Sequence, residues 1–594
     1  MGGRDIAQGQ PNMRFFVISV LAASKFTTCR AFSNSVARAT AAAAAASADA
    51  VKEAQLRAEE AARNVHSGPN NAAMNALFVN VPDFPEPSSC TVVAGAIPDD
   101  LPPGCLMRTG PNGGSENDGF LDGDGMVHCI TFPPKEIRSN ERGVAHSSTY
   151  VETQGRLTEK RARNGSRYAG TLGAAPRGWP MLGALLKNGL AFGTLEAQKD
   201  TCNTALARSG GRVLALMEQS PPTEVRVRRD GSLETVERMA RLGGAVPSAP
   251  ISGGSLGAHG RTCPEMGERV HVSYTSVARP FVRVDYFDPG WKLKRSVGVD
   301  VPAPVMVHDC ALSESYVVLM DFPLTIRPRR LIADSFPVEY EPGNGARIGL
   351  LPRSATSDQT IWFDVENGVV LHAANAYEED DGKVVVIGFK SVPKGEKSFI
   401  LDYTPAFLYK WVLDPSTGKT EERCLRPDIC VEFPVCEDRL VGKKSRYVYG
   451  VVATSMGGPM RQFKTPQAAI LLDSVIKLAV LNGEDGTETA GDVAGRFDLP
   501  DGWHFVSEPT LLEKTSGAGT YVLALATYVP TTSDDGEKAE HIRVATDGSS
   551  MKSRCYVLDG VGLGDDPVCV IDLPKSRHVN YGLHSLYLPW KHMV

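Results

Sequence analysis

The amino-acid sequence predicts an all-β fold, a seven-bladed β-propeller. Its body carries no long apolar repeat of 3.6 residues, and its 58 glycines and 40 prolines recur throughout, which is typical of short strands joined by turns. One unit also repeats, a turn signal followed by a short β-branched apolar run, as in "GERVHVSYTS" from residue 267. Seven such units, beginning at residues 123, 210, 267, 313, 382, 445 and 519, indicate seven blades. A pair of open sandwiches is the alternative architecture.

Residues 1–75 are expected to lie outside this fold. The segment "MRFFVISVLAAS" from Met13 is short for a membrane span but suits a signal segment. The next segment is rich in Ser, Thr and Ala and has Arg but no acidic residue until Asp49, as in transit peptides. Joined at "RAF", with Phe32, the two resemble the bipartite plastid-targeting presequence of algae with secondary plastids. A signal peptide followed by a disordered linker is the alternative.

This presequence predicts a location in the plastid of an alga, at the thylakoid or the envelope, with an endomembrane or secretory location as the alternative. The stretch "ADAVKEAQLRAEEAARNV" should form a solvated linker helix that ends at "SGPNN". We therefore expect one propeller domain over residues 76–594.

The net charge of -6, with both signs interspersed, gives no basic stripe and excludes nucleic acid as the expected partner.

Polar residues stand shortly before several of the apolar runs. His259, His308 and His372 precede the third, fourth and fifth runs, and Glu432 and Glu508 precede the sixth and seventh. If each run is the second strand of a blade, the residue ahead of it lies on the innermost strand, which lines the central axis. Residues that are far apart in the chain would then converge on one point.

His584 lies on a last β-like segment that no further strand follows, as expected if the ring is closed by a strand from the N-terminal end of the domain. Four imidazoles would then meet on the axis. Neutral imidazoles bind Zn, Cu, Fe or Ni, and structural zinc more usually takes local Cys/His clusters, so iron with open positions is the better interpretation. Taken singly, each histidine also fits a hydrogen-bonded core residue.

Three carboxylates in apolar surroundings, Glu218, Glu432 and Glu508, are candidates to accept hydrogen bonds from such histidines. A metal-bound imidazole usually donates its second N–H to an acceptor, and a buried carboxylate needs a partner. A structural ion pair with an arginine is the alternative for each glutamate.

These motifs resemble those of the carotenoid cleavage oxygenases over nearly the whole body of the chain. The matching stretches include "RTGPN", "FLDGDGMVH", "CNTALARSGGRVLALME", "MVHDCALSESYVVLMDFPL", "EFPV", "SEPTLL" and "YGLHSLYLP". The resemblance implies a seven-bladed propeller with a helical or loop cap over a substrate tunnel. It also implies an axial Fe(II) held by His259, His308, His372 and His584, with Glu218, Glu432 and Glu508 behind the histidines.

Two further roles follow from the resemblance. Thr204 in "CNTAL" matches a position whose side chain obstructs one iron coordination site in some members, and Asp309 is expected to be hydrogen-bonded and structural. The sequence departs from the family pattern around His259, where "LGAHGRTCPEMGERV" lacks the usual proline after the ligand. We expect such changes to reshape the tunnel and to leave the chemistry intact.

The implied activity is that of a dioxygenase that cleaves a polyene C=C bond of a carotenoid or apocarotenoid with O2 and forms two carbonyl products. Three alternatives stay open: a stilbene-cleaving oxygenase, an isomerase on the same iron site, and a non-catalytic pigment-binding propeller. Bound iron combined with oxygen consumption would separate them.

Such a substrate resides in membranes, so the tunnel mouth should contact one peripherally. The stretch "GWPMLGALLKNGLAF" is predicted to be a helix with one apolar face, and a buried core helix is the alternative. The residues of this face are Trp179, Met181, Leu182, Leu185, Leu186 and Leu190. The body contains no stretch that predicts a transmembrane span.

Overall fold

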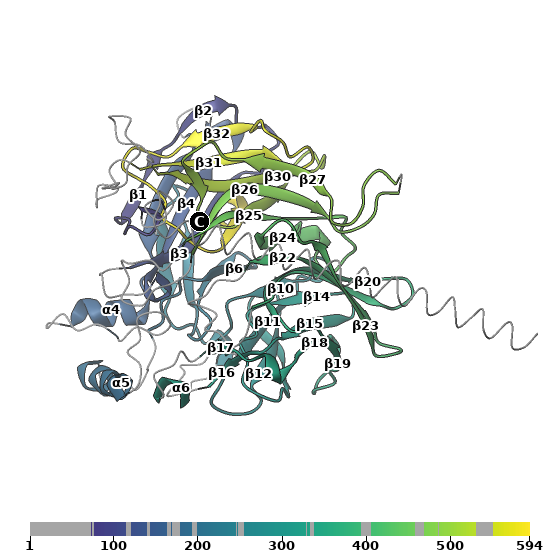
Figure 1. Cartoon of the computed structure of the whole chain (residues 1–594). Helices are drawn as coiled ribbons and strands as arrows, with labels where there is room; N and C mark the ends of the chain where they lie inside the picture. The colour runs from purple at the N-terminus through teal and green to yellow at the C-terminus, as the bar shows by residue number, and fades with distance from the viewer. Residues whose placement is uncertain are drawn as a thin grey trace, which may run out of the picture. The chain divides into compact units, whose positions relative to one another are not determined.

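Strands dominate the computed structural model (Figure 1), which confirms the predicted mainly β class. The structure describes residues 73, 76–113, 120–138, 143–162, 168, 179–192, 199–244, 246, 255–327, 329–332, 338–393, 405–457, 469–484, 486–529 and 551–594. All of these belong to one compact unit, Gln55–Val594. The predicted presequence and linker helix, residues 1–75, lie outside the described residues except for Ala73.

The first sheet joins the two ends of this unit. Its strands are, in spatial order, β1 (Phe84–Ser89), β5 (Ala145–Tyr150), β4 (Asp124–Phe132), β3 (Gly104–Asn112) and β33 (Ser585–Pro589). The last strand of the chain therefore pairs with an N-terminal strand, with Cys105 opposite Leu588. The predicted closure of the ring is confirmed.

Four further sheets, counted here as the second to the fifth, each contain four antiparallel strands. The fourth sheet also has a short hairpin inserted between two of its strands. The second sheet comprises β6 (Ala205–Ser209), β7 (Arg212–Leu216), β8 (Thr223–Val227) and β9 (Leu233–Glu237). The third comprises β10 (Gly260–Thr262), β11 (Arg269–Tyr274), β12 (Val282–Phe287) and β13 (Leu293–Val299). The fourth comprises β14 (Cys310–Leu312), β15 (Tyr316–Asp321), β18 (Ala346–Pro352) and β19 (Ile361–Val365), and its hairpin is β16 (Leu324–Ile326) with β17 (Val338–Tyr340). The fifth comprises β20 (Val369–Glu378), β21 (Val384–Ser391), β22 (Ala406–Asp414) and β23 (Lys419–Arg426).

The remaining strands form one ten-stranded sheet. One antiparallel group contains β24 (Val431–Val435), β25 (Tyr447–Gly457), β26 (Ala469–Ala479) and β27 (Val493–Asp498). The other contains β29 (Thr510–Glu513), β30 (Thr520–Tyr528), β31 (Lys552–Asp559), β32 (Cys569–Asp572) and β2 (Thr91–Gly95). Because β28 (Trp503–Phe505) pairs with both β26 and β30, strand pairing does not separate the two groups. The count of seven blades stays a prediction.

The first strands of consecutive sheets contact one another, as the blades of a propeller do around an axis. Strand β10 contacts β14, β14 contacts β20, and β20 contacts β24, while β33 contacts both β29 and β6. Six of the seven repeated apolar runs are second strands, as predicted. The run from residue 123 is instead the third strand, β4, counted from β33, because the first sheet takes its innermost strand from the C-terminus.

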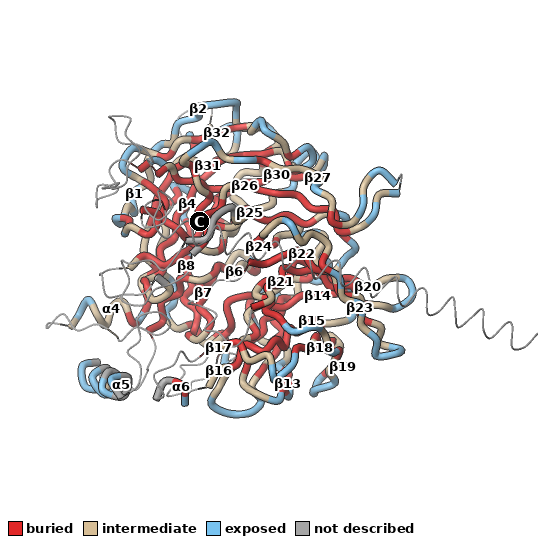
Figure 2. Tube along the Cα trace, viewed as in Figure 1, coloured by how far each residue is buried: buried red, intermediate tan, exposed pale blue. Residues whose placement is uncertain are grey.

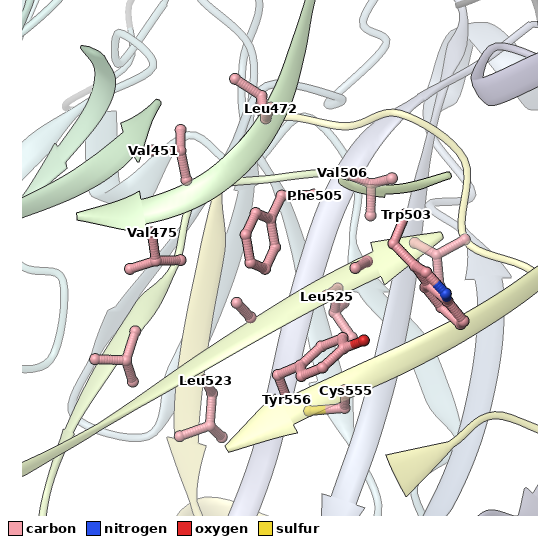
Figure 3. Close-up of a cluster of buried hydrophobic side chains, with 14 of the residues drawn as sticks. Val451, Leu472, Val475, Trp503, Phe505, Val506, Leu523, Leu525, Cys555 and Tyr556 are labelled. Atoms are coloured by element: carbon pink, nitrogen blue, oxygen red, sulfur yellow. The ribbon is translucent and has the colours of Figure 1, made fainter. Parts of the chain in front are cut away.

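The core consists of apolar side chains between these sheets. Figure 2 shows that buried residues follow the strands, whereas outer strands such as β2 are exposed. Figure 3 shows one part of this core, where Phe505 and Tyr556 pack edge to face among aliphatic side chains. Burying each large apolar side chain contributes about 1.5–3 kcal/mol, so the sheets hold the innermost strands in fixed positions.

Few helices accompany the sheets. Within the described ranges they include α3 (Lys135–Arg138), α4 (Gln154–Arg161), α5 (Trp179–Phe192) and α6 (Arg329–Ile332), with short 3-10 turns η1 (Phe120–Asp122), η2 (Leu242–Gly244), η3 (Pro342–Asn344), η4 (Asp438–Leu440) and η5 (Trp590–His592). Helix α5 contacts α6 at one edge, at the lower left of Figure 1. Within the described ranges, none of the helices meets the length and hydropathy that a membrane span requires.

Candidate metal centre

The four histidines singled out in the sequence meet at the innermost strands of four different sheets or groups. His259 directly precedes β10, His308 stands two residues before β14, His372 lies within β20, and His584 directly precedes β33. One nitrogen of each lies within 4.8 Å of the others. The structure thus brings together residues that are separated by up to several hundred positions in the chain.

The spacing of the nitrogens suits one shared metal ion. The Nε2 atom of His308 lies 3.1 Å from Nε2 of His259 and 3.2 Å from Nε2 of His372. Two nitrogens bound to one ion at about 2.1 Å, and at right angles, are about 3.0 Å apart. His259, His372 and His584 are buried, so protein would surround most of a bound ion.

Each of the three predicted glutamates accepts a hydrogen bond from a different histidine. Nδ1 of His308 contacts Oε1 of Glu218, Nδ1 of His372 lies 3.3 Å from Oε2 of Glu432, and Nδ1 of His584 lies 2.7 Å from Oε2 of Glu508. Because the outer nitrogen donates its proton to a carboxylate, the inner Nε2 presents a lone pair to the centre. Among the described residues, no carboxylate accepts a hydrogen bond from His259.

Backbone groups hold two of these carboxylates in place. The N–H of Phe433 donates to Oε2 of Glu432 at 3.1 Å, and the N–H of Ser585 donates to Oε1 of Glu508 at 2.7 Å. The second bond ties Glu508 to the first residue of the closing strand. The Oε2 atom of Glu218 is buried and receives no hydrogen bond from the described part of the chain.

Burial and the neighbouring charges set the protonation of the imidazoles. Burial, followed by repulsion from the other three histidines, holds the pKa of His259 well below its ordinary value. Burial also lowers the pKa of His372, although Glu432 opposes this effect. Burial alone would lower the pKa of His308 too, but attraction by Glu218 outweighs it and the pKa is raised. His259 and His372 are therefore neutral, as metal ligation requires.

Phe433 packs against the cluster in a backbone conformation that is uncommon for a phenylalanine. Its φ is 54°, in the left-handed region. Its ring stacks on His372 with centroids 5.7 Å apart and meets His584 edge-on at 5.4 Å. Phe433 was not predicted from the sequence, although it is the second residue of "EFPV". Its ring contacts and its unusual backbone conformation identify it in the structure.

A buried ion pair fixes three innermost strands beside the histidines. Arg261 on β10 donates to Oδ2 of Asp309 at 2.5 Å and to the carbonyl of Ala373 on β20 at 2.8 Å. The N–H groups of Cys310 and Ala373 donate to Asp309 at 2.7 and 3.1 Å. Asp309 is thus hydrogen-bonded, and its partner Arg261 was not expected from the sequence.

A cavity of about 920 Å³ extends from the histidines along the innermost strands. His259, His372 and His584 line its inner end together with Phe433. Its mouth, lined by exposed Glu513 and Lys591 among others, is polar. The cavity therefore connects the centre with solvent.

The remaining predicted residues lie elsewhere. Thr204 precedes β6 and donates a hydrogen bond to the amide oxygen of Asn203 at 3.1 Å. It is not among the residues that line the cavity, so its shielding role stays a prediction. In α5, Leu186 and Leu190 are 69% and 89% exposed. The side chains of the other predicted face residues, Trp179, Met181, Leu182 and Leu185, lie outside the described ones.

A centre in which imidazoles alone point inward, and carboxylates stand only behind them, suits a divalent transition metal, so this fold and site define a β-sheet protein whose four histidines can hold a metal ion. The chain belongs to the RPE65 family (Retinal pigment epithelial membrane protein), whose sequence model matches residues 78–589. The resemblance inferred from the sequence motifs is thereby confirmed.

Individual relatives extend over most of the chain. The chain is 28% identical over 528 residues to "Carotenoid 9,10(9',10')-cleavage dioxygenase 1" of Pisum sativum, covering 86% of this chain and 88% of the relative. It is 29% identical over 520 residues to "Apocarotenoid-15,15'-oxygenase" of a Synechocystis species, covering 83% and 91%. A solved structure of the Synechocystis apocarotenoid oxygenase has the same fold, with a TM-score of 0.67 at 23% identity over 88% of this chain and 100% of that one.

Proposed function

We propose that this protein is an iron(II)-dependent dioxygenase that cleaves a C=C bond of a carotenoid or apocarotenoid with O2 and forms two carbonyl products. The observation that carries the proposal is the convergence of four histidine nitrogens within 4.8 Å, in a chain whose relatives include enzymes named for carotenoid and apocarotenoid cleavage. The proposal extends both the substrate class and the activity of these relatives to this chain.

The donor set fits ferrous iron. His259, His308, His372 and His584 would hold the ion, and when bound it would supply the activation of O2. Four neutral ligands leave the full charge of the ion in a buried site, and Glu218, Glu432 and Glu508 offset this charge through the histidine N–H groups. The glutamates also fix the direction of three rings.

The surrounding residues orient the ligands and restrict water. Phe433 covers two of the histidine rings, and the ion pair of Arg261 with Asp309 holds β10, β14 and β20 in register next to the ligands. An alkene cleaved by O2 needs no side chain as a nucleophile or general base. The protein's part is thus to bind and orient the substrate beside the ion.

The test uses the full chain loaded with Fe(II) and a panel of carotenoids and apocarotenoids in detergent, with products identified by mass spectrometry and oxygen uptake recorded. His308→Ala is the control because it removes a ligand. Aldehydes or ketones absent from the control are expected, and their chain lengths identify the cleaved bond. Carbon-conserving isomers would assign the protein to isomerase chemistry, and no product with iron demonstrably bound would redirect the search to stilbenes or to pigment binding.

We further propose that α5 makes a peripheral membrane contact beside the substrate entrance and that residues 1–75 direct the chain to a plastid membrane. Exposed Leu186 and Leu190 support the first proposal, and the composition of the N-terminal segment supports the second. Fusing residues 1–75 to a fluorescent protein in an alga with a secondary plastid tests the predicted location. Plastid fluorescence is expected, and fluorescence in the endomembrane system would contradict it.

A further inference from the structure

Two arginines that the proposed reaction does not use line the axial cavity. Arg208 lies on β6 and Arg269 begins β11, and both line the cavity together with Arg261. Arg269 is opposite Thr262 in the strand pair, three residues beyond the metal-centre residue His259. At a rise of about 3.3 Å per residue, Arg269 lies about 10 Å along the axis from the centre.

Among the described residues, the buried cation Arg269 has no anionic partner. It is only 9% exposed, and its three hydrogen-bond acceptors are Nε2 of His271 at 2.8 Å, Oγ1 of Thr262 at 2.9 Å and the carbonyl of Gly260 at 3.4 Å. His271 is neutral, because burial and then the charge of Arg269 hold its pKa well below the ordinary value. All three acceptors are therefore uncharged, whereas buried arginines in proteins are almost always paired with an anion.

Arg208 adds a second unpaired guanidinium to the same space. Its Nε atom is buried and has no hydrogen-bond partner, and no carboxylate in the described ranges forms an ion pair with it. Both arginines line the same cavity, and burial, followed by the charge of Arg261 and with a smaller effect of Arg208, lowers the pKa of Arg269 to about 10. Arg269 therefore remains charged at neutral pH.

The carboxylates of the cavity are engaged elsewhere or lie at its mouth. Asp309 pairs with Arg261 at 2.5 Å, and Glu437 pairs with Arg439 at 2.6 Å. Asp438 is exposed at the mouth, and its charge reaches Arg269 only over a distance, without an ion pair between them. Within the described ranges, Arg208 and Arg269 thus have no carboxylate partner inside the cavity, although Arg269 also lies over the ring of Trp291, 5.3 Å from its centroid.

We propose that the axial cavity binds a small oxyanion between Arg208 and Arg269. A guanidinium offers a planar fork of N–H donors that matches the paired oxygens of a carboxylate or of a sulfate-type or phosphate-type group. The open donor of Arg208 and the charge of Arg269 would both be satisfied by one such ion. The anion would enter from the polar mouth and would lie outside the ring of histidines.

The experiment is selenate binding to the full chain, because selenate is an oxyanion with a strong anomalous X-ray signal. Crystals soaked in selenate should show an anomalous peak between Arg208 and Arg269, and calorimetric titration should show one site per chain. Arg208→Gln should weaken binding about tenfold or more, the effect of losing one charge-assisted hydrogen bond. A parallel titration with acetate distinguishes a site for carboxylates from a site for inorganic oxyanions.

The matched control is Arg226→Gln, which removes the same charge from β8, where Arg226 forms an exposed pair with Glu234. It should leave selenate affinity within about twofold, because exposed charges act weakly over distance. The test does not require a variant of buried Arg269, because Arg208→Gln compared with Arg226→Gln decides it. No peak between the two arginines, a peak only at surface positions, or equal affinities of Arg208→Gln and Arg226→Gln would overturn the proposal.

Discussion

Nδ1 of His308 contacts Oε1 of Glu218 although 90 residues separate them in the chain. Glu218 follows β7 in the second sheet and His308 precedes β14 in the fourth, so the contact joins two sheets between which the chain forms the whole third sheet. The direction of this ring therefore depends on a sheet that contributes no histidine to the centre.

Replacing Glu218 with Gln is expected to reduce metal affinity about tenfold or more, because the neutral amide no longer balances the charge of the ion through His308. Competition with a chelator, followed by metal analysis, measures the affinity for Fe(II) or Co(II). The control is Glu421→Gln, which removes an exposed carboxylate from β23. Equal affinities of the two variants would mean that Glu218 has only a packing role.

Phe433→Gly is expected to be more stable than Phe433→Ala by about 1 kcal/mol. Both variants lose the ring that packs on His372, but only glycine adopts the φ of 54° without a steric penalty. Urea unfolding of the metal-loaded variants gives the difference in the free energy of unfolding. An alanine variant as stable as the glycine variant would show that the backbone relaxes out of the left-handed region.

Asp309→Asn is expected to cost about 3 kcal/mol or more, because it leaves Arg261 as an uncompensated charge among the innermost strands. The control is Asp300→Asn, whose carboxylate pairs with Arg279 at the surface, with 75% and 51% of the two side chains exposed. That pair should contribute about 1 kcal/mol or less. Similar losses for both variants, measured as free energies of unfolding, would contradict the structural role of Asp309.

Acid is expected to destabilise the protein through His146, which is buried on β5 with its Nε2 atom 3.2 Å from Nδ1 of His128. Burial, followed by the charge of Arg577, lowers the pKa of His146 to about 3. The unfolded chain, with an ordinary histidine pKa of about 6.5, binds the proton first, so stability falls as the pH drops below that value.

Between pH 7.5 and pH 5 this single group should cost about 2 kcal/mol. His146→Gln cannot take up the proton, so its free energy of unfolding should depend on pH less steeply by that amount. The comparison is made between the two pH dependences, which removes any constant loss of stability in the variant. Parallel curves would show that His146 is protonated in the folded protein.

Replacing both Leu186 and Leu190 with Asp is expected to weaken binding to phosphatidylcholine vesicles about 100-fold, because each leucine loses the free energy of transfer into the membrane. Flotation of the full chain with vesicles measures the effect. Val561→Asp, at an exposed apolar position elsewhere, is the control. Unchanged flotation of the double variant would exclude α5 as the membrane contact.

The sequence could predict the mainly β class and the closing strand because both depend on local patterns, a recurring turn and strand unit and a last strand without a successor. The four histidines were found for a related reason, since each lies on or just before the innermost strand of its sheet. One strand did not follow the pattern. Strand β4 is the third strand of its sheet and not the second, because β33 occupies the innermost position there.

Other parts of the site depend on contacts that no local pattern records. Arg269 resembles an ordinary strand residue in the sequence. Only the folded structure shows that its hydrogen-bond partners are all neutral. Phe433 likewise gives no sign in the sequence of its backbone conformation. Glu218 stands after its apolar run, unlike Glu432 and Glu508, and was predicted only through its apolar setting and the family resemblance.

The closing strand also sets the order in which the protein can be completed. The edge of β3 that pairs with β33 stays unpaired until residues 585–589 have been synthesised, since Cys105 pairs with Leu588. His584 directly precedes this strand, so the fourth imidazole arrives together with ring closure. Such distant pairings form slowly, and an unclosed sheet edge invites association with other chains. A chain that has not yet added β33 therefore offers at most three of the four imidazoles.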